Sequence, residues 1–99
     1  MAKQDERFTA DNIKNLQKTS EHLRVLAHPI RLKIIHILLN KPNCVGELAS
    51  ACQISSQVIS SHLRKLSDKG ILKKQRDGRK VFYQIIKPVH QNIVNCLLA

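Results

Sequence analysis

Two short helical patterns, joined by a three-residue turn, precede a hairpin signal in the second half of the chain. The pair covers residues 44–66, and its second helix follows Ser55, a residue type that favours the N-cap position. The dipeptide Asp77-Gly78 then divides residues 71–85 into two potential strands. Asp-Gly between such strands is a strong signal for a β-hairpin, because both turn positions accept positive φ. A helix, a turn, a second helix and a hairpin in this order predict a winged helix-turn-helix.

Apolar residues at helical spacing predict three more helices around this unit. They cover about residues 9–26, 29–39 and 88–99, and each of the last two begins at a proline, which suits the first turn of a helix. Residues 40–43 are predicted to form a turn, and Gly70 a left-handed cap after the helix that follows Ser55. The predicted fold class is therefore mainly α (α+β), with about five helices and a two-stranded β-hairpin wing at residues 71–85. All 99 residues are predicted to form one domain, since chains divide into domains only well above this length, and residues 1–8 are predicted to be flexible.

Positive charge dominates the sequence and is concentrated in its last third. The chain has 17 Lys and Arg against 7 Asp and Glu, a formal net charge of +10, and residues 62–99 hold nine of the bases but two of the acids. Such a balance favours phosphate-rich partners or anionic membrane surfaces. The apolar runs are far shorter than the roughly 20 residues of a membrane span, so no transmembrane helix is predicted. Three aromatic residues are too few to stack the bases of a single strand, which favours duplex DNA as the partner.

The helix that follows Ser55 carries a polar face opposite a predicted buried stripe of Ile59, Leu63 and Leu66. Short or flexible polar side chains let a helix enter the major groove, where Gln can pair with adenine and Arg with guanine or phosphate. A solvated surface face is the alternative, but such a face is usually richer in Glu and Lys than in Ser. For His62, a packed and partly buried imidazole is an equal alternative to a DNA contact. The predicted DNA-binding residues of this helix are Ser56, Gln57, Ser60, Ser61, His62, Arg64 and Lys65.

Five basic residues lie around Asp77 in the predicted hairpin. The simpler interpretation is that these are ordinary edge-strand charges, which discourage pairing with other strands. Their density at a tight turn favours contact with phosphates or with the minor groove instead. The predicted contacts at this wing are Arg76, Arg79 and Lys80, with Lys73 and Lys74 beside them.

Four stretches of the sequence together carry a resemblance to a known family. They read L-A-H-P-I-R-L-K-I-I at 26–35, V-G-E-L-A at 45–49, I-S-S-Q-V-I-S-S-H-L-R-K-L at 54–66 and G-I-L-K-K-Q-R-D-G-R-K-V-F-Y at 70–83. Over about residues 20–90 the chain resembles the ArsR/SmtB family of bacterial winged-helix repressors. The resemblance implies a homodimer, formed by the first and last helices, that binds an inverted-repeat operator. It also implies release from DNA when a metal ion, arsenite or a reactive sulfur or oxygen species engages a sensor site.

Apolar stripes on the first and last helices predict the dimer interface. A domain of 99 residues has little other means of covering such stripes. The predicted interface residues are Ile13, Leu16, Val89, Ile93 and Leu97.

The sensor sites that the resemblance implies are incomplete in this chain. Metal sensors of the family often carry C-V-C-D-L where residues 44–48 read C-V-G-E-L, so the second thiol is missing. Other members open the last helix with an Asp-x-His pair, and residues 87–90 supply one imidazole. Members that sense persulfides have a cysteine at the position of His36, so that thiol is missing here as well. Because the metal sites are incomplete, the sequence predicts no metal, and it predicts no cofactor.

The three cysteines are candidates for sensing or for packing. Cys52 is predicted to be a buried structural thiol, and Cys96 lies on the stripe expected to face a partner. With Cys44 at the N-cap and Glu47 at N3, a capping box would form, and a thiol at a helix N-terminus is more reactive. With Asn43 at the N-cap, Cys44 would have no special role. The predicted sensor thiols are Cys44 and Cys96.

The sequence contains no catalytic constellation: it has no Gly-rich phosphate loop, no nucleophile elbow and no paired acids. It predicts no enzyme, but a homodimeric, sequence-specific transcriptional regulator. The N-terminus lacks the apolar core of a signal peptide, so the expected location is the cytoplasm. The regulator is predicted to be a repressor that a thiol-reactive signal releases from DNA. A repressor that responds to a metal or to arsenite, and a winged-helix regulator without a small-molecule inducer, are the alternatives.

Overall fold

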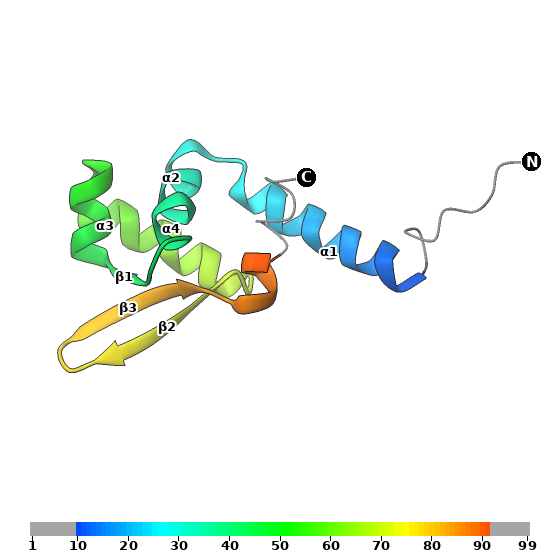
Figure 1. The fold of residues 1–99 in the computed structure, drawn as a ribbon. Coiled ribbons are helices and arrows are strands. Elements are labelled where there is room, and N and C mark those ends of the chain that lie inside the picture. Colours follow the sequence, from blue (N-terminus) through cyan, green and yellow to red (C-terminus); the bar gives the residue numbers. More distant parts are fainter. Residues whose placement is uncertain (1–9, 92–99) are drawn as a thin grey trace, which may run out of the picture.

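The computed structural model describes residues 10–91, in which four helices and three strands follow one another in the predicted order (Figure 1). The elements are α1 (Ala10–Leu26), α2 (Pro29–Leu38), β1 (Asn43–Cys44), α3 (Val45–Cys52), α4 (Ser56–Asp68), β2 (Leu72–Asp77) and β3 (Lys80–Ile85). A further helical segment at 87–91 begins the predicted last helix, whose other residues lie outside the described part, as do residues 1–8. The architecture is a winged helix-turn-helix of the mainly helical α+β class, as predicted. None of the helices in residues 10–91 is both long and apolar enough to cross a membrane.

The sheet contains one strand more than the hairpin that the sequence predicted. Strands β2 and β3 form the two-stranded wing, and β1 pairs with the other edge of β3, which gives the antiparallel order β1-β3-β2. In this pairing Asn43 lies opposite Tyr83 and Cys44 opposite Phe82. The sequence predicted a turn at residues 40–43, because two residues are too few to show the alternation of a strand. The additional strand ties the start of α3 to the wing.

The hairpin turn lies one residue later than predicted. Asp77 and Lys80 are the last strand pair, so Gly78 and Arg79 form the two-residue turn. Gly78 has φ +66°, whereas no non-glycine residue of the turn has a positive φ. Glycine at the first central position meets the need of a type II′ turn, which suits the twist of the flanking strands. The prediction of positive φ at Asp77 was therefore wrong. Gly70, at φ +73° directly after the C-cap residue Lys69 of α4, confirms the predicted left-handed cap.

The apolar core lies between α2, α3, α4 and the bases of the strands. The stripe that the sequence predicted on α4 is confirmed, since all three of its members are fully buried. The largest fully buried side chains are Ile34, Leu48, Ile59, Leu63, Leu66 and Ile71. Truncating one of the buried leucines to alanine is expected to cost about 2–5 kcal/mol of stability, because the neighbours cannot fill the cavity. This core holds α4 rigidly against α3.

The turn between α3 and α4 is fixed by local hydrogen bonds. Gln53 ends α3 in the left-handed conformation at φ 55°, and the Ile54 amide donates to the Ala49 carbonyl (3.1 Å). Ser55 is the N-cap of α4, as predicted, and its hydroxyl accepts a hydrogen bond from the Val58 amide (3.3 Å). An N-cap serine is worth about 1 kcal/mol of helix stability. The direction of α4 is thus set by its own first turn as well as by the core.

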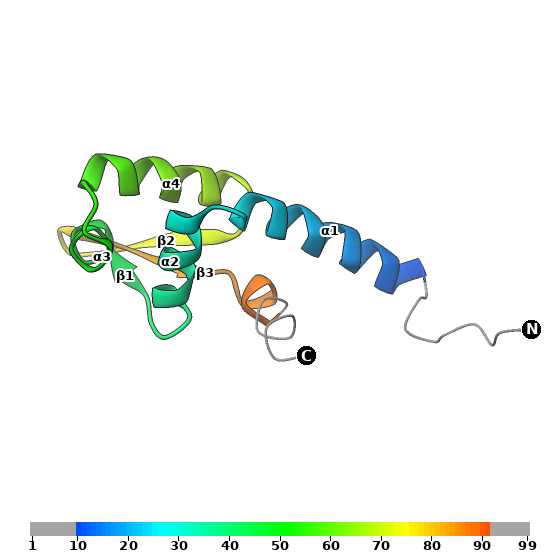
Figure 2. The same ribbon diagram turned by 90° about the horizontal axis from the view of Figure 1, so that it is seen from above.

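Helix α1 stands clear of the core over most of its length. Both ribbon views show it extending from the remainder of the described chain, which it meets at its C-terminal end (Figures 1 and 2). Leu26 in its last turn is 2% exposed. By contrast, Ile13, Leu16 and Leu23 are 44%, 54% and 43% exposed. The apolar stripe of α1 therefore has no cover within the described part of one chain.

Candidate nucleic-acid interface

The outward face of α4 is polar and accessible. At 100° per residue, the direction opposite the buried stripe is centred on Gln57 and Ser61, and Arg64 and Lys65 lie beside them. Ser60 and His62 are half-buried because they lie on the two flanks of the buried stripe. The predicted DNA-binding residues with exposed side chains on this helix are Ser56, Gln57, Ser61, Arg64 and Lys65. Their role in binding DNA remains a prediction.

Val58 is an accessible apolar residue on this polar face and was not among the residues predicted from the sequence. Its side chain is 41% exposed, although valine in a helix of this kind is usually buried. The residue lies one helical turn before His62 and beside Gln57. An exposed methyl-bearing side chain in the major groove can contact the 5-methyl group of thymine. The sequence did contain the signal, since Val58 lies outside the stripe of Ile59 and Leu63.

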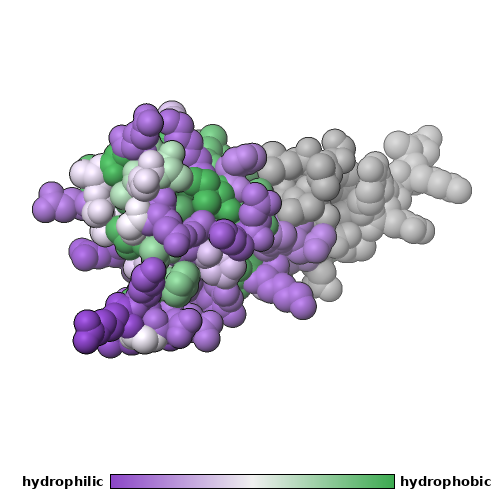
Figure 3. All heavy atoms as spheres, turned by 60° about the vertical axis from the view of Figure 1, so that its left-hand side comes forward, coloured by the Kyte–Doolittle hydropathy of each residue, from purple (hydrophilic) through white to green (hydrophobic). Residues whose placement is uncertain are grey.

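The basic residues of the wing are exposed. Leu72 anchors β2 in the core, and the rest of that strand projects into solvent. Seen from the end of the molecule where α3 and the hairpin tip lie, hydrophilic residues (purple) cover most of the lower surface (Figure 3). The exposed bases of the wing are Lys73, Lys74, Arg76, Arg79 and Lys80. A projecting, positively charged ribbon of this kind suits a polyanion.

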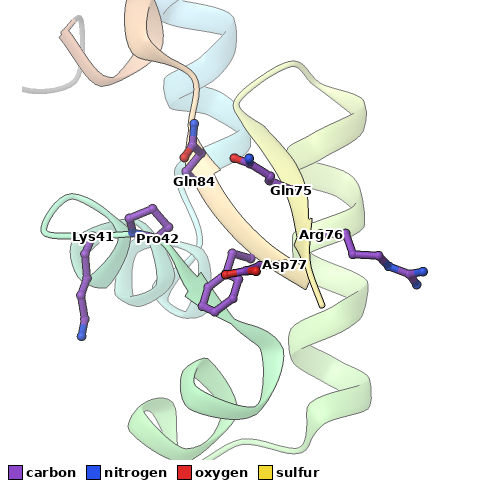
Figure 4. Close-up of a pocket in the computed structure, with 7 residues that line it drawn as sticks. Lys41, Pro42, Gln75, Arg76, Asp77 and Gln84 are labelled. Atoms are coloured by element: carbon purple, nitrogen blue, oxygen red, sulfur yellow. The ribbon is translucent and has the colours of Figure 1, made fainter. Parts of the chain in front are cut away.

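A hollow of about 570 Å³ lies between the wing and the loop after α2 (Figure 4). Its lining includes two bases, one acid and two glutamines, but these groups do not converge. Figure 4 shows Arg76 pointing away from the other labelled side chains, and Lys41 lying on the opposite side of the hollow. Such a mixed and open lining defines no class of ligand. The lining residues are Lys41, Pro42, Gln75, Arg76, Asp77, Phe82 and Gln84.

His62 belongs to a cluster at the junction of α2 and α4. Its Nδ1 accepts a hydrogen bond from Arg31 Nε (3.2 Å), and its ring centre lies 4.8 Å from that of His28. Burial lowers the pKa of His62, and the nearby His28, Arg31 and Lys65 lower it further. The two interpretations of His62 are therefore compatible, because a packed imidazole can keep one nitrogen for DNA. A contact with DNA stays a prediction.

Cys44 occupies the N-cap of α3, but its thiol makes no capping hydrogen bond. Of the two N-cap positions that the sequence left open, the structure therefore has Cys44, but without the thiol hydrogen bond of a capping box. A thiol is a weak acceptor, and the pairing of Cys44 with Phe82 in β3 already holds its backbone in the extended conformation. The side chain is half-buried. Cys52 is 8% exposed, as predicted for a packed thiol, and Cys96 lies outside the described residues.

The predicted dimer residues differ in accessibility. Ile13 and Leu16 are exposed on α1, in a shallow hollow that Gln17, Ser20, Glu21 and Arg24 complete. Val89 is 5% exposed because it packs into the core of its own chain, which leaves little of its side chain for a partner. The predicted residues Ile93 and Leu97 lie outside the described part.

Histidine and cysteine residues do not gather into a metal centre between residues 10 and 91, where no group of three or more His, Cys, Asp or Glu could hold an ion. His36 is exposed, and His90 Nε2 lies 3.4 Å from the Leu39 carbonyl oxygen. His22 is 9% exposed, and its Nδ1 has no hydrogen-bond partner among the described residues. Burial lowers the pKa of His22, as does Lys18, while Glu21 acts in the opposite direction.

A helix pair that offers a polar helix face, joined to a basic hairpin, defines a winged helix-turn-helix protein. A family model described as "bacterial regulatory protein, arsR family" matches residues 28–74. The biofilm growth-associated repressor of Xylella fastidiosa is 30% identical over 97 residues, which cover 98% of this chain and 80% of that protein. The chain belongs to the ArsR family of bacterial regulatory proteins.

Two further relatives show how far the similarity extends. The HTH-type transcriptional repressor SmtB of Mycobacterium tuberculosis is 36% identical over 70 residues, which cover 71% of this chain. The chain spans about half of the length of that repressor (52%). The structure of reduced HlyU from Vibrio cholerae matches with a TM-score of 0.76 at 28% identity, over 90% of this chain and 94% of that one. The similarity to that solved structure thus extends over nine tenths of the chain.

Proposed function

We propose that this protein is a homodimeric, sequence-specific DNA-binding transcriptional repressor. The observation that carries the proposal is the exposed polar face of α4 beside an exposed basic wing. In this function α4 enters the major groove, where Gln57 and Arg64 contact base edges or phosphates. The wing residues Arg76, Arg79 and Lys80 contact phosphates or the minor groove and position the domain. Membership of the ArsR family supports the same function.

The second copy covers the exposed stripe of α1. Ile13 and Leu16 form an apolar surface that solvent would otherwise contact, and a two-fold axis brings the same surface from both chains together. Two copies of α4 then read two half-sites of an inverted repeat, about one helical turn of DNA apart.

The proposed signal is a thiol-reactive species, and Cys44 is its proposed target. The half-buried thiol lies at the start of α3 and in the strand that pairs with β3, so an added group would act on both α3 and the wing. Only a few kcal/mol of difference between free and bound geometries suffices to release an operator. A metal- or arsenite-responsive repressor and a regulator without an inducer are the alternatives.

Fluorescence anisotropy with a duplex selected from a random pool tests DNA binding. The double variant Gln57→Ala and Arg64→Ala is expected to lose about 1–3 kcal/mol at each base position that it contacts, and to accept more sequences. An unchanged affinity for the selected duplex would remove α4 as the reading helix.

The signal is tested by measuring operator affinity of the wild type and of Cys44→Ser before and after mild peroxide or persulfide treatment. Loss of affinity in the wild type alone supports Cys44 as the target. If both proteins respond equally, Cys44 is a bystander. If neither responds and zinc or copper releases the DNA, the metal-responsive alternative is correct.

A further inference from the structure

One arginine side chain connects three helices next to the proposed DNA-reading surface. Arg31 lies in the first turn of α2, and its guanidinium donates from Nη1 to the Val25 carbonyl at the end of α1 (2.9 Å). The same group donates from Nε to His62 Nδ1 on α4 (3.2 Å). Through these two hydrogen bonds, Arg31 on α2 is joined to both α1 and α4.

The hydrogen bond from Arg31 determines the protonation state of His62. An imidazole nitrogen that accepts a hydrogen bond carries no proton, so the ring proton of His62 lies on Nε2. A doubly protonated ring would lose this bond and would place a positive charge against Arg31, Lys65 and His28. The lowered pKa of His62, caused first by burial and then by these neighbours, agrees with a neutral ring.

The other nitrogen of His62 is open to a ligand. Within the described part of the chain, His62 Nε2 has no hydrogen-bond partner, and it is not among the buried polar atoms that lack one. His62 lies on the flank of α4, one turn after Val58 and one turn before Lys65 or Leu66. His62 thus lies at the border of the surface that the proposed function puts against DNA, where phosphate oxygens follow the groove.

We propose that Arg31 is a positioning residue for DNA binding, which holds His62 with its Nε2–H as a donor to a DNA phosphate and ties this donor to the end of α1. The inference rests on the proposed function. Arginine suits the task because its planar guanidinium offers several donors in fixed directions, whereas a lysine ammonium cannot keep both bonds in the same geometry. A change in the placement of α1, the proposed dimer helix, would therefore reach the donor on α4 through one side chain.

A double-variant cycle on operator affinity tests the proposal. His62→Ala removes a hydrogen bond to a charged group and should weaken binding by about tenfold or more. Arg31→Lys keeps the charge and should weaken binding by roughly threefold to tenfold through the loss of the oriented donor. In the His62→Ala background, Arg31→Lys should have no further effect. Lys33→Arg, an exposed exchange of cations on the same helix, is the matched control and should bind like the wild type.

The cycle has two outcomes that overturn the proposal. Arg31→Lys without effect shows that the arginine positions nothing that DNA needs. An equal loss from Arg31→Lys with and without His62 shows that Arg31 acts by its own contact or through the fold. Both outcomes leave the proposed function intact as long as the Gln57 and Arg64 double variant still loses operator affinity.

Nitrogen chemical shifts of His62 give a second test, whose deciding measurement uses the wild-type protein alone. At pH 7.5 the wild-type protein, free and bound to its operator, should show a neutral His62 with an unprotonated Nδ1 and a protonated Nε2. In the Arg31→Lys protein the chemical shifts of Nδ1 and Nε2 should move toward those of a free imidazole, in which the two neutral tautomers are mixed. A His62 that is protonated at Nδ1 in the wild-type complex refutes the proposal directly, whatever the variants do.

Discussion

An exposed valine on a DNA-reading helix should make binding depend on thymine methyl groups. Val58 is 41% exposed on α4, so it has apolar surface that a complex can bury. Burial of one methyl-sized group is worth about 0.8 kcal/mol, or a factor of about four in affinity. A homodimer on an inverted repeat uses the contact twice, which raises the expected factor to about 15.

The assay replaces thymine by deoxyuridine, one symmetric pair of positions at a time, in a selected operator. The wild type should lose about 15-fold at one pair of positions, and Val58→Ala should bind both duplexes equally. Val58→Thr keeps the shape but exchanges a methyl for a hydroxyl, and should be intermediate. Gln57→Ala is the control, since it should lose affinity on both duplexes and keep the dependence on the methyl group. A wild type that is insensitive to every replacement would show that Val58 does not contact thymine.

Four further predictions concern charge, assembly, pH and helix capping. If about 6–10 phosphates are contacted, affinity should fall on the order of a thousandfold or more between 50 and 200 mM salt. Arg79→Ala should weaken binding to all sequences alike and reduce the salt slope, and an unchanged slope excludes a phosphate contact. Leu16→Asp places a charge in the proposed apolar interface and should give a monomer in sedimentation; an unaltered dimer refutes that interface. The pKa values of His22 and His62 are lowered in the folded protein, so the unfolded chain takes up protons first as the pH falls. The contribution of these histidines to the free energy of unfolding is therefore present above their ordinary pKa of 6.5 and is lost as the pH falls through their folded-state pKa values. The melting temperature should therefore drop between pH 7.5 and 5.5, and less so in a variant with glutamine at both positions. Ser55→Ala should cost about 1 kcal/mol in denaturant unfolding, whereas no change would deny the cap its role.

Much of the fold was predictable because its signals are local. Ser55 starts α4 by a hydrogen bond within its own first turn, and Gly70 ends that helix through its own positive φ. The stripe on α4 is a pattern of spacing, so it indicated the outward face as well as the buried one. The polar face of the candidate site could be predicted for the same reason.

The parts that the sequence did not predict depend on pairing across the chain. Strand β1 has two residues, and it forms because Asn43 and Cys44 pair with Tyr83 and Phe82 of β3, which lie about 39 positions later in the sequence. The strand register likewise moved the turn, since Asp77 pairs with Lys80 instead of turning the chain. The hydrogen bond between Arg31 and His62 joins positions 31 residues apart, and the identity of neither residue indicates which partner it has. Local patterns carry no information about such contacts.

The exposed stripe of α1 links the two proposals about assembly and DNA binding. Helices in proteins gain most of their stability from packing an apolar face, and the 17-residue helix α1 buries little beyond its last turn. Its stability must then come from a covering surface, which a second copy supplies, so the order of α1 depends on protein concentration. Arg31 bonds to the carbonyl of Val25 at the end of this helix and to His62 on α4. A partner that covers α1 therefore also stabilises the Arg31 contact between α1 and α4. We expect α4 to be held in place better in a dimer than in a monomer, even before any DNA is present.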